Sequence, residues 1–287
     1  MIGRTPASVR VLQPLRQGTM AGHRISELIL RYLVVRVCGQ RRLFRPIAFI
    51  SVPPKITTVE ERAIAQAAYS AGAKQVHLVS EALLSGLGAG LDITQPRGHL
   101  VVNIGAGTTD VAVLSMHNEV VSESVRLGGE DFTQAIIRYL RRQRNLVVGD
   151  LTAEQVKLKV ASVVPTDGQM EVKGQDYVLG LPKLERVSAL ELQGVLLECV
   201  EPIIATIVHV LEQTPPELSR DIWTSGMVLT GGGALLHGLA EVLEQATGVF
   251  VQVAPDPLLC VINGMQILMT AGQYSSGYAI SSDHTAG

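Results

Sequence analysis

The chain has 287 residues, of which 47% are hydrophobic and 17% charged, and its formal net charge is −2. This composition excludes an intrinsically disordered chain, and the near-neutral charge excludes a global basic field that would attract nucleic acid. The three cysteines are far apart and lack the spacing of metal ligands. We therefore expect a globular, cytoplasmic protein with free thiols and without a metal site.

The first third of the chain alternates helical apolar spacing with β-branched runs. The predicted elements are a helix at 25–37, a strand at 47–52, a helix at 58–71, a strand at 76–79 and a helix at 83–90. Thr58 and Glu61 have the form of a capping box for the second of these helices. Glu81, which precedes the third helix, is positioned to orient or deprotonate an attacking water or, alternatively, is a solvated surface charge.

The central stretch, 100–114, consists of two apolar runs of strand length with a glycine-rich turn between them. Gly105 and Gly107 let a ligand approach the backbone, and the N–H groups of such a turn can bind an anion. Thr108 and Thr109 add hydroxyl groups. A strand follows, whereas a Walker A loop or a dinucleotide fingerprint opens a helix. The pattern indicates a phosphate-binding β-hairpin or, alternatively, an ordinary hairpin turn.

The second half of the chain shows the same alternation of patterns. The predicted elements are a strand at 119–124, helices at 131–144 and 152–164, a polar hairpin at 170–179, a helix at 188–212, a strand at 227–230, a helix at 234–245, a strand at 250–253 and a helix at 258–271. The hairpin is expected to turn near Gly174, and Pro202 is expected to kink or break the long helix. Residues 273–287 are expected to form a loose tail.

Two further groups of residues are candidates for a binding site. Gly231, Gly232 and Gly233 join a strand to a predicted helix, where a nucleotide can pack against the backbone beside free N–H groups. Alternatively, these glycines form only a tight turn. Glu154 and Lys157 lie three residues apart on one helical face, so they hold a ribose and an adenine or form a surface ion pair.

These motifs together resemble a known family. The segment from Asn103 to Asp110 is similar to the second phosphate motif of the actin, Hsp70 and sugar-kinase superfamily, and the segment from Leu229 to Leu235 is similar to its adenosine motif. Further segments resemble bacterial MreB, the actin-like rod-shape family, over nearly the whole chain. These segments are 3–6, 59–64, 125–129, 211–218 and 226–236, and the segments 79–82 and 256–264 resemble the two connecting helices of the superfamily.

The resemblance implies an α/β, actin-like (ribonuclease H-like) ATPase fold with two domains. Domain I would comprise residues 1–97 together with 256–272, and domain II would comprise residues 98–255 with an inserted small subdomain at about 144–195. The family's first phosphate motif, Asp-x-Gly-Thr, has no copy in this chain. We therefore expect a truncated first domain.

The resemblance also implies roles for the candidate residues. Glu81 would orient the water that hydrolyses a bound ATP. The residues that would hold the phosphates are Gly105, Ala106, Gly107, Thr108 and Thr109. The residues that would hold the adenosine are Glu154, Lys157, Gly231, Gly232, Gly233 and Ala234. Asn103 stands where the family usually has an Asp, and an amide carries no charge to offset a magnesium ion, so we expect weak magnesium binding and a weak or absent ATPase.

The family's function follows as an expectation: ATP-dependent filaments at the inner face of the cell membrane determine cell shape by guiding cell-wall synthesis. Leu43 and Phe44, flanked by arginines, fall where the family has a membrane-contacting loop or, alternatively, pack under the next strand. Expected partners are further copies, a full-length MreB and the cell-wall elongation machinery, with no nucleic acid. The alternatives are a catalytically weakened paralogue that binds filaments or membrane, and a small-molecule kinase of the same superfamily.

Overall fold

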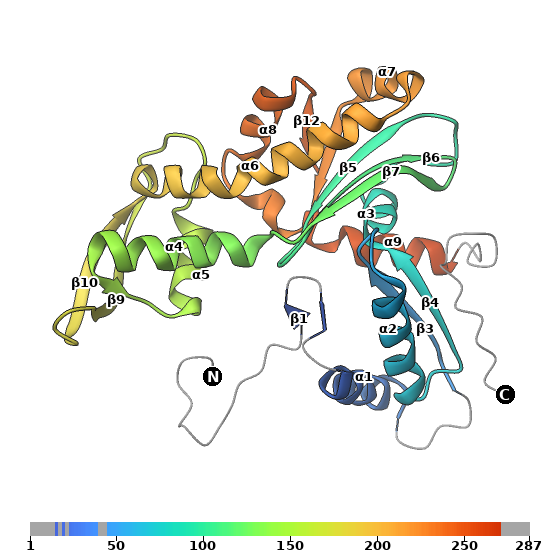
Figure 1. Cartoon of the computed structure of the whole chain (residues 1–287), viewed down its shortest axis with the longest axis horizontal. Coiled ribbons are helices and arrows are strands. Elements are labelled where there is room, and N and C mark those ends of the chain that lie inside the picture. Colours follow the sequence, from blue (N-terminus) through green and yellow to red (C-terminus); the bar gives the residue numbers. More distant parts are fainter. Residues whose placement is uncertain (1–14, 17–18, 21–22, 40–44, 271–287) are drawn as a thin grey trace.

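The structure, a computed structural model, describes residues 15–16, 19–20, 23–39 and 45–270. Leu43, Phe44 and the predicted tail at 273–287 lie outside these residues. The first elements, β1 (Leu15–Arg16) and β2 (Thr19–Met20), pair in antiparallel fashion. The remaining elements form three groups, which Figure 1 shows at the lower right, at the top and at the left.

The first group is a small parallel sheet with two helices. Strands β3 (Ile47–Val52) and β4 (Gln75–Ser80) pair over their full length, and α2 (Thr58–Ser70) connects them. A helical crossover of this kind is the usual connection between parallel strands. Helix α1 (His23–Cys38) packs beside α2. The buried side chains of this group are small: Val52, Ala65, Ala68, Ala73, Val76 and Leu78.

The second group is a five-stranded sheet with the order β12-β11-β5-β6-β7. The strands β5 (His99–Ile104), β6 (Thr109–Ser115) and β7 (Asn118–Val125) form an antiparallel meander. Strands β11 (Met227–Thr230) and β12 (Val251–Val253) extend it in parallel on the other side of β5. The predicted hairpin at 100–114 is therefore confirmed, and it lies at the centre of the molecule.

Helices cover both faces of this sheet (Figure 1). On one face, the long helix α6 (Ala189–Gln213) packs against the strands, with α7 (Pro216–Ser225) and α8 (Leu239–Thr247) beside it. By length and composition alone α6 could cross a membrane, but seven of its side chains belong to the protein core. It is therefore the main core helix of this face. The buried side of β5, β6 and α6 forms the larger of the hydrophobic clusters.

The opposite face of the sheet is covered by two crossing helices. Helix α3 (Glu81–Gly88) follows β4 directly, and α9 (Cys260–Thr270) packs across it. A Cβ atom at Gly88 would overlap the carbonyl oxygen of Cys260, and one at Gly264 would overlap the carbonyl oxygen of Leu84. Backbone therefore touches backbone at this crossing, which joins the small parallel sheet to the five-stranded sheet.

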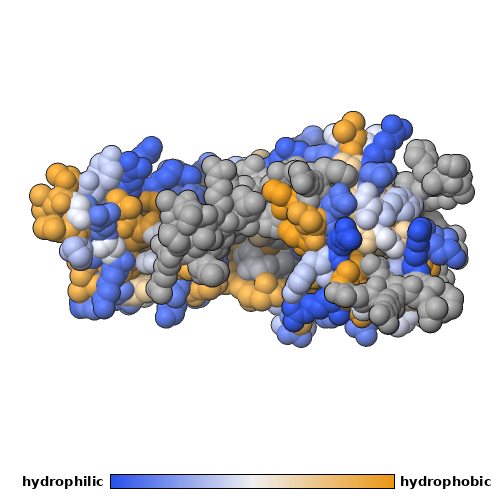
Figure 2. Space-filling model, turned by 90° about the horizontal axis from the view of Figure 1, so that it is seen from below, coloured by the Kyte–Doolittle hydropathy of each residue, from blue (hydrophilic) through white to orange (hydrophobic). Residues whose placement is uncertain are grey.

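The third group lies beside the second and consists of two helices and a three-stranded sheet. Its elements are α4 (Gly129–Arg144), β8 (Leu146–Val147), α5 (Asp150–Lys159), β9 (Gln169–Asp176) and β10 (Pro182–Ser188). The hairpin β9–β10 ends in exposed apolar side chains, and Figure 2 shows an apolar patch at this end of the molecule. These side chains are Tyr177, Val178, Leu179, Leu181 and Leu184.

Several predicted boundaries are wrong, each for a local reason. The N-cap of α2 is Thr57, which accepts a hydrogen bond from the N–H of Glu60, and not Thr58 with Glu61. Two threonines in a row made the register of the capping box ambiguous. The hairpin does not turn at Gly174, which lies inside β9, where a Cβ would be 2.5 Å from the Val147 carbonyl oxygen. The absence of a side chain at Gly174 allows β8 to approach β9 closely.

Four further differences concern helices. Pro202 does not break α6, which is continuous from Ala189 to Gln213. The predicted helix at 234–245 is a short 3₁₀ turn, η1 (Gly232–Leu235), followed after a gap by α8. The predicted helix at 152–164 begins earlier and ends at Lys159. Helix α7 had no counterpart in the prediction.

Candidate functional site

The two glycine turns lie side by side at the same end of the five-stranded sheet. Asn103 pairs with Thr230 in the parallel register of β5 and β11, so the turn after each strand emerges at the same edge. Gly231 has a φ of +79°, and a Cβ there would overlap the carbonyl oxygen of Ile104. A Cβ at Gly233 would overlap the Ile104 side chain. Only glycine fits at these two positions, and the resulting contact brings together segments more than a hundred residues apart.

The turn at 105–108 directs its carbonyl groups toward the start of α4. Gly129 N–H donates to the Gly105 oxygen at 2.9 Å, and Glu130 N–H donates to the Ala106 oxygen at 2.7 Å. Among the described residues, the N–H groups of residues 106–108 make no backbone hydrogen bond. A run of free N–H groups is the arrangement that binds phosphate oxygens.

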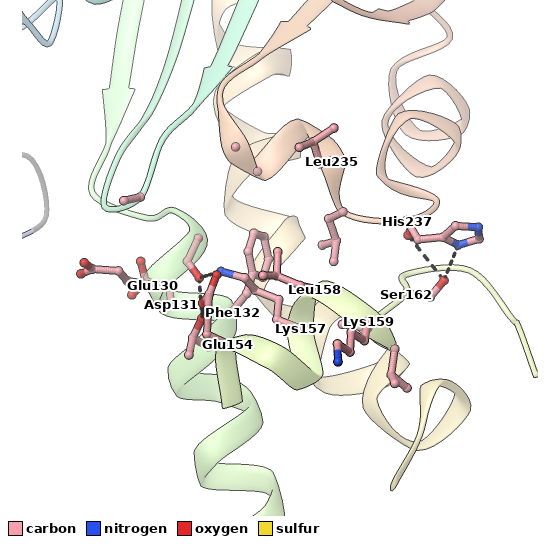
Figure 3. A pocket seen from close by; sticks show the side chains of 18 of the residues that line it. Glu130, Asp131, Phe132, Glu154, Lys157, Leu158, Lys159, Ser162, Leu235 and His237 are labelled. Atoms are coloured by element: carbon pink, nitrogen blue, oxygen red, sulfur yellow. Dashed lines mark hydrogen bonds and ion pairs between the residues drawn. The ribbon is translucent and has the colours of Figure 1, made fainter. Parts of the chain in front are cut away.

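Helix α5 presents the predicted pair Glu154 and Lys157 to this region (Figure 3). Lys157 Nζ lies 2.8 Å from Glu154 Oε2 and donates at 2.8 Å to the Gly129 oxygen. Thr133 Oγ1 donates to the same Glu154 oxygen at 2.6 Å. The two residues therefore form an ion pair, but one that is fixed to the start of α4 and not a free surface pair.

A cavity of about 1210 Å³ lies between the glycine turns and helices α4 and α5. Six of the predicted binding residues line it: Gly105, Ala106, Glu154, Lys157, Gly232 and Gly233. Five others belong to the same turns and strands but do not line the cavity: Gly107, Thr108, Thr109, Gly231 and Ala234. The hydroxyl of Thr109 donates to the Leu127 carbonyl at 2.8 Å and is buried.

The far end of the cavity contains a pair that the sequence did not indicate. Ser162 Oγ is 3.0 Å from His237 Nδ1, and it donates to the Val164 carbonyl at 2.6 Å. Residues Ser162 and His237 also form an isolated parallel bridge. This contact joins the end of α5 to the segment after η1 and so closes the cavity at that side (Figure 3). No local pattern announces it, because the two residues are 75 positions apart.

Glu81 does not line this cavity. It is the first residue of α3, which packs on the face of the five-stranded sheet opposite to α6. Ser51 Oγ on β3 donates to Glu81 Oε1 at 3.2 Å. Burial raises the pKa of the Glu81 carboxyl, and the hydrogen bond from Ser51 offsets part of this effect. The side chain is therefore held in a mostly buried position, and the surface-charge alternative does not describe it.

Behind the turn at 105–108 runs a row of polar side chains that crosses four strands. The strand registers pair Thr230 with Asn103, Asn103 with Asp110, and Asp110 with Ser124. Thr230 Oγ1 donates to Asn103 Oδ1 at 3.2 Å, the Asn103 amide hydrogen-bonds Asp110, and Ser124 Oγ donates to Asp110 Oδ1 at 2.6 Å. We call these four residues the polar row.

Asp110 is the charged member of the polar row and is fully buried. Its Oδ2 atom has no hydrogen-bond partner. Burial, and to a smaller extent the nearby carboxylates of Glu81 and Glu119, raise the pKa of Asp110 to about 7, although the Ser124 and Asn103 hydrogen bonds oppose this. Asp110 entered the sequence-based predictions only as the end of a motif, without a role of its own. The two-residue period of a strand, which puts Asp110 on the same face as Ala112 and Leu114, is the signal that could have placed it on the face toward α3.

The chain is similar to proteins of known family. The model of the MreB/Mbl protein family matches residues 1–275. The cell shape-determining protein Mbl of Bacillus subtilis is 40% identical over 271 residues, which cover 94% of this chain and 81% of Mbl. The cell shape-determining protein MreB of Escherichia coli is 40% identical over 267 residues, which cover 92% of this chain and 77% of MreB.

Solved structures give the same result. The structure of MreB5 of Spiroplasma citri bound to AMPPNP matches with a TM-score of 0.90 and 34% identity, covering 96% of this chain and 83% of that chain. The ADP-bound structure of MreB5 matches with the same TM-score. The MamK double helical filament matches with a TM-score of 0.75 at 20% identity, over 90% of this chain and 80% of that chain, which is a likeness of fold alone.

Proposed function

Because this chain belongs to the MreB/Mbl protein family, we propose that it is a cytoskeletal subunit that binds ATP and assembles into filaments. Its fold is the actin-like α/β fold that the motifs predicted, as the likeness to MreB5 and MamK establishes. The filaments lie at the inner face of the cell membrane and determine cell shape by guiding cell-wall synthesis. The domain boundaries predicted from the sequence, 1–97 with 256–272 and 98–255, belong to this proposal.

The observation that carries the nucleotide site is the meeting of two glycine turns at one cavity. Free N–H groups at 106–108 suit the β- and γ-phosphates, with Gly105 and Thr109 completing the turn. The turn at 231–234, together with Glu154 and Lys157, suits the adenosine. MreB5 of Spiroplasma citri was solved with AMPPNP and with ADP, which supports a nucleotide in the corresponding place.

Hydrolysis is expected to be weak. Glu81 is the residue that orients the attacking water, and an ionised carboxylate does this by accepting a hydrogen bond from it. The residues near the phosphate turn fit a magnesium ion poorly, since the Asn103 amide oxygen already accepts a hydrogen bond from Thr230. Among the described residues, no group of three or more His, Cys, Asp or Glu side chains is placed to hold a metal. A magnesium ion would therefore be held mainly by the nucleotide and by water.

Nucleotide binding is tested with Lys157→Ala. Lys157 lines the cavity and is held at the start of α4, so its loss is expected to weaken binding of a fluorescent ATP analogue about tenfold, the size of one charge-assisted hydrogen bond. Lys173→Ala, at an exposed position of β9, is the matched control and should bind normally. A folded Lys157→Ala protein with unchanged affinity would show that the nucleotide does not occupy this cavity.

Filament formation is tested by pelleting the protein with ATP, first alone and then with a full-length MreB. Sedimentation of the protein alone supports the subunit role. Sedimentation only in the presence of MreB supports the alternative, a catalytically weakened paralogue that binds filaments. Absence from the pellet in both experiments contradicts self-association and co-polymerisation together.

Membrane binding depends on Leu43 and Phe44. Two apolar side chains beside arginines favour a surface of anionic lipid, so Leu43→Ser/Phe44→Ser is expected to reduce co-sedimentation with vesicles that contain anionic phospholipid. Val178→Ser/Leu179→Ser, at the exposed tip of the β9–β10 hairpin, is the matched control for the loss of two apolar residues. Equal binding by both variants contradicts the assignment of the membrane contact to Leu43 and Phe44.

A further inference from the structure

Asp110 of β6 and Glu81 of α3 lie on two elements that pack against each other, and we call the buried contact between these elements the seam. Val101, Ala112 and Leu114 of the sheet pack against α3, and alternation along β6 places Asp110 on the same face as Ala112 and Leu114. Glu81 begins α3, directly before Ala82 of the same cluster. Asp110 therefore lies on the face of the sheet that α3 covers, and Glu81 lies at the start of α3, near the edge of the sheet that carries the turn at 105–108.

The neighbours of Asp110 supply no positive charge. The charged groups that act on it are Glu81 from α3 and Glu119 from β7, and both are acidic. The cations beyond them at the domain boundary, Lys55 and Arg126, are already paired at the surface with Glu123 and Glu60. Two buried carboxylates without a cation cannot both remain ionised at neutral pH, so one of the two groups keeps its proton.

The surroundings of the two groups differ, and this decides where the proton resides. Glu81 is the first residue of a helix, where the helix dipole favours a negative charge, and it accepts a hydrogen bond from Ser51. Asp110 is sealed inside the sheet, and its Oδ2 atom has no donor. A carboxylate oxygen without a donor is costly, whereas a carboxylic acid needs fewer donors.

We infer that Asp110 keeps its proton at neutral pH, and that Asp110 is thereby a positioning residue that leaves Glu81 as the charged carboxylate of the two. The inference deepens the proposed function, because a charged Glu81 is the form that accepts a hydrogen bond from the attacking water. Asp110 itself touches neither nucleotide nor water. Its polar row also connects this proton to the two glycine turns through Asn103 and Thr230.

The direct test is carbon-13 NMR of the carboxyl groups in the nucleotide-free protein as pH is varied. The Asp110 signal is identified by its loss in Asp110→Asn. It is expected to titrate near pH 7, the value to which burial and Glu81 raise its pKa. Titration near the ordinary pKa of an aspartate, about 4, would overturn the inference, because Asp110 would then be ionised at neutral pH.

Reciprocal variants show whether the two groups are coupled. Glu81→Gln is expected to lower the apparent pKa of Asp110, because it removes a negative charge that acts on Asp110, whereas Asp110→Asn is expected to leave the pKa of Glu81 nearly unchanged, because Asp110 is already neutral where Glu81 titrates. Glu212→Gln, at an exposed position near the end of α6, is the matched control and should change neither value. An unchanged pKa of Asp110 in Glu81→Gln would contradict the coupling of the two groups. If Asp110→Asn does not fold, the Glu81→Gln measurement alone decides the question.

The inference and the proposed function fail in different experiments. If Asp110 titrates near pH 7 but no ATP turnover is measurable, the hydrolysis part of the proposed function is contradicted and the inference is left in place. ATP turnover together with two independently titrating carboxyl groups contradicts the inference and leaves the hydrolysis part of the proposed function in place. Where turnover is present, Asp110→Asn is expected to remove the change in turnover rate near pH 7 while nucleotide affinity remains within about twofold, since the amide preserves the hydrogen bond from Ser124.

Discussion

The two sheets that supply the cleft residues differ in how deeply they are buried. In the five-stranded sheet every residue of β6 is buried, and five of the six residues of β5 are buried. In the small parallel sheet, one of the six residues of β3 and three of the six residues of β4 are buried, and the core there consists mostly of alanine and valine. The glycine turns emerge from the first sheet, whereas Glu81 follows the second.

Because of this difference in burial, the turns proposed to bind nucleotide and the residue proposed for hydrolysis depend on parts of the molecule with different local stability. Regions with fewer buried apolar contacts open locally at lower free energy than the main core. The turns that would hold a nucleotide are therefore anchored in the stable part of the molecule. Glu81 directly follows β4 of the lighter part, so opening of that part would displace Glu81 while the two turns stay in place.

The largest expected effect is at the helix crossing that joins the two regions. Gly88→Ala or Gly264→Ala would push a Cβ into a backbone carbonyl, so each is expected to lower the free energy of unfolding by about 5 kcal/mol or more. Urea unfolding measures the change. Gly194→Ala is the control, because a Cβ in that part of α6 meets no atom within 4 Å, and it should stabilise by about 0.5–1 kcal/mol.

A matched pair of core substitutions sharpens the comparison. Leu100→Ala in the five-stranded sheet and Leu78→Ala in the parallel sheet both remove a fully buried side chain, at a cost of roughly 3 kcal/mol each. Hydrogen exchange should separate them: Leu78→Ala should speed exchange in β3, β4 and α2 only, and Leu100→Ala throughout the molecule. Equal patterns from both variants would mean that the two regions unfold as one unit.

The smallest expected effect concerns two ion pairs between the regions. Lys55 lies 2.5 Å from Glu123 of β7, and Arg126 lies 3.2 Å from Glu60 of α2. Both pairs are solvent-exposed, so a double-mutant cycle on Lys55 and Glu123 should give less than about 1 kcal/mol, decreasing at high salt.

The pair of Glu171 and Arg186 within the β9–β10 hairpin serves as the control that spans no boundary. A coupling several times larger between Lys55 and Glu123 than in this control would contradict the view that the helix crossing, and not the surface charges, joins the regions.

The strands and the two glycine turns could be predicted from the sequence because their signals are local. β-branched runs bounded by glycine identify β5, β6 and β11 within one or two residues. The contact between the two turns followed only from the family resemblance, since nothing local relates Gly105 to Gly231. The structure supplies the physical reason, which is the parallel pairing of β5 with β11.

Other features were not predictable because they depend on tertiary contacts. The role of Gly174 lies in the approach of β8, and the pair of Ser162 and His237 joins positions far apart in the chain. Pro202 is accommodated within α6, which packs along the five-stranded sheet. The burial of Asp110 needed the strand register, which fixes its neighbours on both sides.

The helix crossing at Gly88 and Gly264 also limits how the molecule can move. With main chain against main chain, the two helices cannot come closer, and no side chain there can be repacked to absorb a sliding motion. A displacement that keeps this contact is a rotation about the crossing point, as in a pair of scissors. A few degrees at this pivot would translate into the widest excursions at the two ends of the molecule, the β9–β10 hairpin and helix α1 (Figure 1).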